Sequence, residues 1–226
     1  MKPEHLDALI TEARRIHERF SVEFVEGFGF CPWAKKARVE GRTATRVLLY
    51  AEGDTRAPIL DAMKELGEDE TYEVTFILFP ALDMERKAFE QLTATLREEY
   101  AEVYDGSPPM ALAAFHPSAP FNDSSAARAL PFVRRSPDPT IQMVRRSVLD
   151  SVRSGSDSGT GFIDLENVDF ASILSAPPSK PPLHERVAET NAATLRREGQ
   201  GRLEGVLADI CRDRDESYAP LLKPET

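Results

Sequence analysis

Tyr72-Glu73-Val74-Thr75-Phe76-Ile77-Leu78-Phe79 is the strongest strand pattern in the chain. β-Branched and aromatic residues dominate it, and its second half is continuously apolar. Continuity of this kind is typical of a strand covered on both faces, since neither face then has to meet water. The stretch therefore predicts a buried strand in an α/β domain.

Helical and strand patterns alternate on both sides of this stretch. Before it we expect a strand at Arg46 to Ala51 and a helix from Ile59 to a stop at Gly67. After it we expect a long helix from Asp83 to Val103 and a third apolar strand at Met110 to Phe115. This order favours parallel strands joined by right-handed crossovers. We predict an α/β fold with a mainly parallel sheet of three or more strands, flanking helices and a helical C-terminal part. A ferredoxin-like α+β arrangement is the alternative.

The other elements are expected to be mostly helical. Apolar residues at three- and four-residue steps predict an amphipathic helix over residues 4–26, and a short helix follows from Pro32. Residues 116–139 are expected to be irregular and to be followed by a helix over 139–152. A short strand is expected at 160–165.

We interpret residues 1–226 as a single domain. An α/β core would cover residues 1–152, and the Ser/Gly-rich and Pro-rich stretch 153–182 would form a flexible linker or lid. Two helices within 183–214 would pack on the core.

Composition narrows the class of protein. The 226 residues carry a net charge of −10, which argues against a broad nucleic-acid footprint or an acidic membrane surface as partner. No apolar run approaches the roughly 20 residues that span a bilayer, and the N-terminus lacks a signal-peptide pattern. Two cysteines far apart suggest a reducing compartment. We expect a cytoplasmic protein without nucleic-acid or membrane partners; the sequence leaves the oligomeric state open.

The stretch Gly27-Phe28-Gly29-Phe30-Cys31-Pro32-Trp33-Ala34 holds the only Trp and one of two Cys. Because Pro32 suits the first turn of a helix, Cys31 is expected at the N-cap, where backbone N–H groups and the macrodipole favour a thiolate. Cys31 is therefore a candidate nucleophile, and the alternative is a small buried residue beneath Trp33. Cys211 is expected on an apolar helix stripe and unreactive.

His116 follows the third expected strand in Phe115-His116-Pro117. Ligands gather at the carboxyl ends of parallel strands, so His116 is a candidate general base or orienting group. The alternative is a strand-end histidine that is hydrogen-bonded to a loop. No Cys and His residues have the close, paired spacing of a metal site, and no cofactor is implied.

Arginine is concentrated near the expected helix start at 139. Between Arg128 and Arg146 there are five Arg and a single acid, Asp138. The guanidinium fork suits carboxylate or phosphate, so Arg134 and Arg135 are candidates for binding an anionic substrate. The alternative is pairing with surface acids.

Asn191 shares a helix face with the apolar residues Val187 and Leu195. An inward amide must be hydrogen-bonded, because an unpaired buried polar group costs about 1–3 kcal/mol. Asn191 would either tie loops together or contact a ligand.

These motifs together resemble a known bacterial family, the domain of unknown function 1415. The resemblance is carried by Gly29 to Lys35, Phe115-His116-Pro117 with Phe121, Arg135 to Thr140 and Glu189 to Arg196. It covers about residues 5–200 in the family's order. The family has no settled activity, so the resemblance implies only that Cys31, His116, Arg135 and Asn191 belong to one set. Cys31-Pro32-Trp33-Ala34 is also weakly similar to the Cys-Pro-Phe-Ala turn of glutathione transferases.

The leading hypothesis is a cytosolic enzyme, a cysteine-dependent transferase or hydrolase, acting on a small anionic substrate. Cys31 and His116 would be catalytic, and the two side chains are expected within one hydrogen bond or one bridging water. The substrate would be held by Arg134, Arg135, Asn191 and Trp33. The alternatives are a non-catalytic module that binds a small anion or metabolite, and a structural protein that docks a partner.

Overall fold

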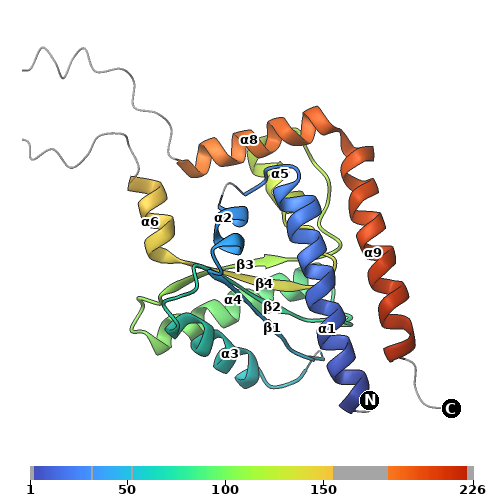
Figure 1. Ribbon diagram of the computed structural model, residues 1–226. Coiled ribbons are helices and arrows are strands. Elements are labelled where there is room, and N and C mark those ends of the chain that lie inside the picture. Colours follow the sequence, from blue (N-terminus) through green and yellow to red (C-terminus); the bar gives the residue numbers. More distant parts are fainter. Residues whose placement is uncertain (1–2, 32, 52, 155–182, 223–226) are drawn as a thin grey trace, which may run out of the picture.

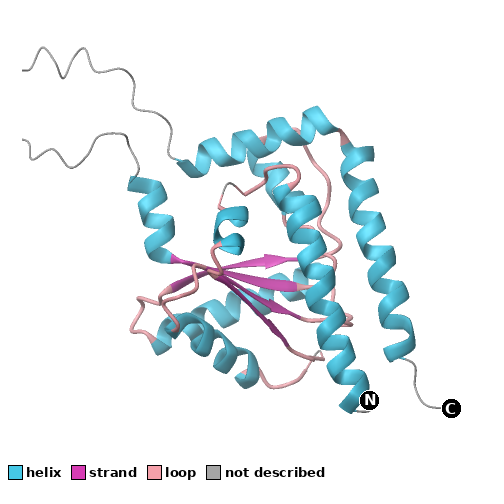
Figure 2. Cartoon of the chain, viewed as in Figure 1, coloured by secondary structure: helices cyan, strands magenta, loops and turns pink. Residues whose placement is uncertain are grey.

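The computed structural model describes residues 3–31, 33–51, 53–154 and 183–222 (Figure 1). Figure 2 shows a sheet with helices on both sides, so the α/β class predicted from the sequence is confirmed. In chain order the elements are α1 (Pro3–Arg19), the π-helix η1 (Phe20–Glu26), α2 (Ala34–Val39), β1 (Thr43–Val47), α3 (Ala57–Glu68), β2 (Val74–Leu78), α4 (Arg86–Val103), β3 (Met110–Phe115), α5 (Ala126–Val133), β4 (Thr140–Arg145), α6 (Arg146–Ser154), α8 (Leu183–Glu198) and α9 (Gln200–Leu222).

The sheet is mixed, so the prediction of a mainly parallel sheet is wrong. The strand order is β1-β2-β4-β3, with β1 parallel to β2 and β4 antiparallel to both of its neighbours. Because β2 and β3 both oppose β4, they run in the same direction. The connection through α4 therefore leaves a gap of one strand position, which β4 fills. The parallel β1–β2 pair also excludes the ferredoxin-like alternative, in which every pairing is antiparallel.

The error arises at residues 139–152, which the sequence suggested were one helix. Ile141, Val144 and Val148 have helical spacing, but Ile141 and Met143 also alternate with Gln142 as in a strand. The backbone N–H and C=O groups exposed on β2 and β3 decide between the two patterns, because they need partners. The chain forms β4 between them and becomes helical at Arg146.

Other boundaries moved for similar reasons. Pairing with β2 sets β1 at Thr43–Val47, a few residues before the predicted strand. The predicted helix over 4–26 is α1 continued by η1, and the segment expected to be irregular contains α5. The strand expected at 160–165 and most of the linker expected at 153–182 lie outside the described residues.

The two faces of the sheet are covered differently. α3 and α4 pack directly on one face, where the side chains of Ile59, Met63, Phe89, Ile141 and Met143 form a single core. α1, α5, α8 and α9 lie over the other face (Figure 1). Their aromatic and aliphatic side chains pack mainly on one another, and the largest group contains Phe20, Phe24, Phe132, Leu195 and Leu207. Among the described helices, none is both long and apolar enough to cross a membrane.

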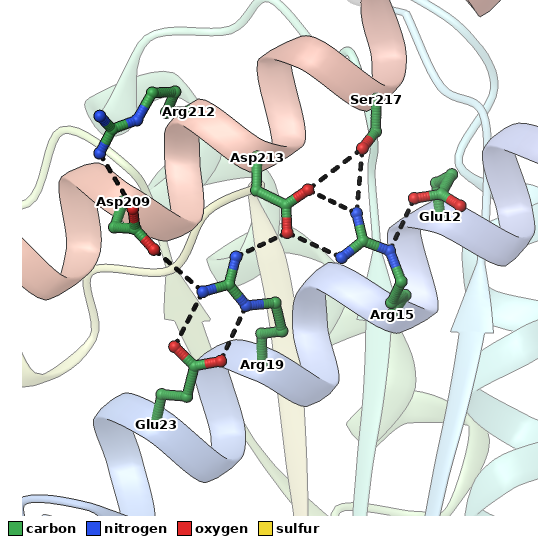
Figure 3. A network of polar contacts seen from close by, with 8 residues as sticks. All are labelled: Glu12, Arg15, Arg19, Glu23, Asp209, Arg212, Asp213 and Ser217. Carbon is green, nitrogen blue, oxygen red and sulfur yellow. Dashed lines mark hydrogen bonds and ion pairs between the residues drawn. The ribbon is translucent and has the colours of Figure 1, made fainter.

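An ion-pair network joins α1 to α9 (Figure 3). The two carboxylate oxygens of Asp213 accept from the Nη atoms of Arg15, both at 2.7 Å. Oδ2 of Asp213 also accepts from Arg19 at 2.6 Å, and Arg19 reaches Asp209 and Glu23. Hydrogen bonds from Arg15 and then from Arg19 hold the pKa of the Asp213 carboxyl well below its usual range. Asp213 is therefore the shared acceptor that holds α9 against α1.

Replacing Asp213 by Asn should lower the unfolding free energy by about 1–2 kcal/mol at low salt, because two guanidinium groups lose their common anion. A lowered folded-state pKa stabilises the protein above the unfolded pKa of about 4. The difference from wild type should therefore shrink as pH falls below about 4 and vanish only near the folded-state pKa of Asp213, well below that value. Urea unfolding at several pH values measures it. Asp215→Asn is the control, because Asp215 pairs locally with Arg214; an equal loss in that variant would contradict the assignment.

Candidate functional site

A cavity of about 490 Å³ lies between the sheet and the helical layer. Thr45, Phe76, Gln142 and Phe115 form its floor, one from each strand, and the walls come mainly from α1, η1, α5 and α8. The volume falls within the roughly 300–1,000 Å³ of small-molecule sites. The cavity exists because the helices that cover this face of the sheet pack against each other more than against the strands.

A tight reversal after η1 brings Cys31 to this cavity. At Gly27 a Cβ atom would lie 2.3 Å from the Glu23 carbonyl oxygen, so only glycine fits there. Gly29 has a φ of 68°, a conformation that other residues rarely adopt. The Phe30 N–H then donates to the Val25 carbonyl at 2.9 Å and turns the chain back. Cys31 and Trp33 consequently line the cavity wall.

Cys31 does not occupy the N-cap that the sequence suggested. The N-cap of α2 is Trp33, two residues later. Burial raises the pKa of the Cys31 thiol, and the backbone N–H groups of Trp33 and Ala34 oppose this shift without overcoming it. The thiol is therefore protonated at neutral pH. The N-cap was misplaced because α2 begins only at Ala34, three residues after Cys31.

Both thiols should react more slowly with iodoacetamide in the native protein than in urea at pH 7.5. Burial also raises the pKa of Cys211, and only the thiolate is the nucleophile. Mass-spectrometric mapping over a time course separates the two sites. A Cys31 that reacts faster in the folded protein than in urea would show that the fold activates it.

The two neighbouring arginines have different environments. Arg134 lines the cavity, and its carbonyl oxygen accepts from the His116 N–H at 3.0 Å, which places it beside the end of β3. Burial lowers the pKa of its guanidinium, and no carboxylate in the described part of the chain forms an ion pair with it. Arg135 instead donates to the Ala119 carbonyl at 2.5 Å and to Glu204 at 2.9 Å. Arg134 is therefore the one available to a ligand.

Asn191 reaches the same cavity from α8. It is 5% exposed, and within the described residues its side-chain amide has no hydrogen-bond partner. Cys31, Trp33, Arg134 and Asn191 thus line one cavity, whereas Arg135, which the sequence grouped with Cys31 and Asn191, does not.

His116 belongs to a different cavity, of about 450 Å³, near the end of α9. Its Nδ1 accepts from the Ser118 N–H at 3.1 Å, so its Nε2–H donates to the Met84 carbonyl at 3.0 Å. Burial lowers the pKa of this imidazole. The ring packs near Phe89 of α4, whereas Phe115, one residue earlier, faces the first cavity. Cys31 and His116 therefore line different cavities, and the predicted contact between them is wrong. The reason is that successive side chains along a strand point to opposite sides of the sheet, so His116 points away from the side that Phe115 faces.

The second cavity also contains a buried carboxyl group. Asp138 is 6% exposed and accepts from the Tyr218 hydroxyl at 2.8 Å. Burial raises the pKa of Asp138 to about 6, although the bond from Tyr218 opposes the shift. This contact fixes the end of α9 to the loop before β4.

The raised pKa of Asp138 predicts a specific pH dependence. A carboxyl with a raised folded-state pKa favours folding when protonated, and this contribution is lost as pH rises from about 4 to about 6. Asp138→Asn, which stays neutral, should gain roughly 2–3 kcal/mol over wild type between pH 4 and pH 7.5. Urea titrations at both pH values measure this gain. Asp83→Asn, an exposed change in the same cavity, should show no such trend; a pH-independent difference for Asp138→Asn would contradict the prediction.

Several polar residues of the first cavity were not predicted from the sequence, and three of them lie close to Phe76. Gln142 and Thr45 lie on the floor, and His17 lines it from α1 with its ring 4.4 Å from that of Phe76. Burial lowers the pKa of His17 to about 4, so the imidazole is neutral. Gln142 was hidden by the helical interpretation of β4. His17 had a readable signal, since it lies on the apolar stripe of the first helix between Ala13 and Phe20.

Metal binding has no support in the described residues, which contain no group of three His, Cys, Asp or Glu side chains that could hold an ion.

A family model described as Protein of unknown function (DUF1415) matches residues 13–176, and the chain belongs to this family. Neither a curated protein nor a solved structure matches the chain. The matched residues include Cys31, Trp33 and Arg134 of the cavity.

Proposed function

We propose that the protein binds a small molecule with an apolar body and one anionic group in the cavity between the sheet and the helical layer. The observation that carries the proposal is the environment of Arg134. Arg134 is half-buried, lines a largely apolar cavity and has no ion pair within the described chain. A partly buried cation without a directly bonded counter-ion is unfavourable, and an anionic ligand would supply that counter-ion.

The surrounding side chains fit the same type of ligand. The Asn191 amide can donate to an anionic oxygen, and its own lack of a partner among the described residues would then be corrected. Phe20, Phe30 and Trp33 offer apolar contact for the rest of the molecule. Cys31 would contribute a neutral, polarizable wall.

This arrangement supports a binding module more than the Cys/His enzyme. The two nitrogens of His116 are bonded to backbone groups in the other cavity, so His116 cannot act on Cys31. The Cys31 thiol is protonated at neutral pH and has no basic side chain bonded to it in the described structure. Nucleophilic catalysis by a thiol needs a thiolate or an adjacent base.

Octanoate is a suitable probe because it combines one carboxylate with an apolar chain. Arg134→Gln should weaken octanoate binding about 10- to 100-fold, because a charge-assisted hydrogen bond contributes about 1.5–3 kcal/mol. Isothermal titration calorimetry measures the Kd, and octylamine should not bind.

Arg135→Gln is the matched control, since it changes the neighbouring arginine, which already bonds to Ala119 and Glu204. Its octanoate Kd should equal that of wild type. If Arg134→Gln binds as well as wild type, or if Arg135→Gln alone loses binding, the proposed anion site is wrong.

A further inference from the structure

Three uncharged polar side chains surround Phe76 on the cavity floor. Thr45 of β1 and Gln142 of β4 are the direct strand partners of Phe76 on its two sides. His17 lies above it, with ring centroids 4.4 Å apart. All three line the cavity. We call His17, Thr45 and Gln142 the Phe76 subsite.

The polar groups of the Phe76 subsite lack partners. His17 is 8% exposed, and its Nε2 is buried with no hydrogen bond in the described structure. The side chains of Thr45 and Gln142 likewise form no hydrogen bond to a described residue. Buried polar groups in folded proteins are nearly always paired, so the unpaired Nε2 of His17 indicates a missing polar partner, and the half-buried Thr45 and Gln142 side chains beside it can bond to the same partner.

The Phe76 subsite lies away from Arg134. The strand order β1-β2-β4-β3 puts Phe76 on β2, whereas Arg134 lies beside the end of β3. These strands are two spacings apart, which corresponds to roughly 10 Å across the sheet. A single ligand could reach both groups, with its apolar body over β4.

We propose that the ligand carries, at the end remote from its anionic group, a neutral hydrogen-bonding group such as a hydroxyl, carbonyl or amide, which the Phe76 subsite recognises. This inference rests on the proposed function and adds the class of ligand: an anion whose far end is polar and uncharged. A simple fatty acid lacks the second group, and a dicarboxylate or an amino acid would place a charge there.

The charges around the Phe76 subsite favour a neutral group. The His17 imidazole is neutral at physiological pH, so it offers one donor and one acceptor without charge. Glu73, the acid on the cavity lining nearest in sequence to Phe76, already pairs with Arg42. Arg14 and Glu18 line the cavity on either side of His17 in sequence, but both are exposed and their charges are opposite, so a charged ligand group would lose its hydration without gaining a buried counter-ion.

The test compares octanoate with ω-hydroxyoctanoate on the full chain by isothermal titration calorimetry. Wild type should bind the hydroxy acid about three- to tenfold more tightly, the gain of one or two net hydrogen bonds. Gln142→Met and His17→Phe should each abolish this preference, measured as the ratio of the two Kd values in the same variant, so that any change in affinity common to both acids cancels. The Met variant nearly conserves volume, so it provides the test even if His17→Phe does not fold.

A matched pair of isosteric variants controls for packing. Thr45→Val should reduce the preference for the hydroxy acid. Thr75→Val makes the same change on the opposite face of the sheet, where Thr75 is fully buried and its hydroxyl also lacks a partner in the described structure. It should keep the wild-type preference.

The possible outcomes separate this inference from the proposed function. If wild type binds both acids equally, the Phe76 subsite is wrong while the anion site stands. If the preference survives in both Gln142→Met and Thr45→Val, the subsite is wrong as well. If neither acid binds, the proposed function fails, and this inference fails with it.

Discussion

The insertion of β4 between β2 and β3 is the constraint on which the rest of the structure depends. Its backbone groups complete two antiparallel ladders, and the Phe79 N–H extends the pairing by donating to the Pro139 carbonyl at 3.0 Å. Because side chains alternate along the strand, β4 serves both faces of the sheet. Ile141 and Met143 enter the core under α3 and α4, while Gln142 contributes to the cavity floor.

Polar contacts hold α9 to the rest of the protein. Asp213 binds α9 to α1, Tyr218 binds the end of α9 to Asp138, and Arg135 reaches Glu204 of α9. The large aromatic side chains of this layer, such as Phe24 and Phe132, pack on one another and leave the space over the sheet unfilled. Protein interiors are normally close-packed, so a space of this size is consistent with the small-molecule site proposed above.

Neighbouring residues in this chain often have unrelated roles. Arg134 faces the cavity while Arg135 stacks on Phe132 and bonds to loop and helix groups. Phe115 faces the helical layer, whereas His116 packs near Phe89 on the other side. A sequence motif that contains both members of such a pair cannot indicate which one meets a ligand.

The sequence by itself determined the elements that depend on local pattern. The buried strand β2, the strand β3 and the amphipathic helix α3 follow from hydrophobic periodicity, which acts over a few residues. It also indicated Cys31, Trp33, Arg134 and Asn191, because such side chains are unusual where they occur. Only the tertiary structure decided the rest. The hydrophobic pattern of residues 140–145 fits both a helix and a strand. The backbone N–H and C=O groups of β2 and β3 need partners, and they selected the strand. That choice fixed the sheet as mixed, brought Gln142 into the cavity and placed His116 outside it.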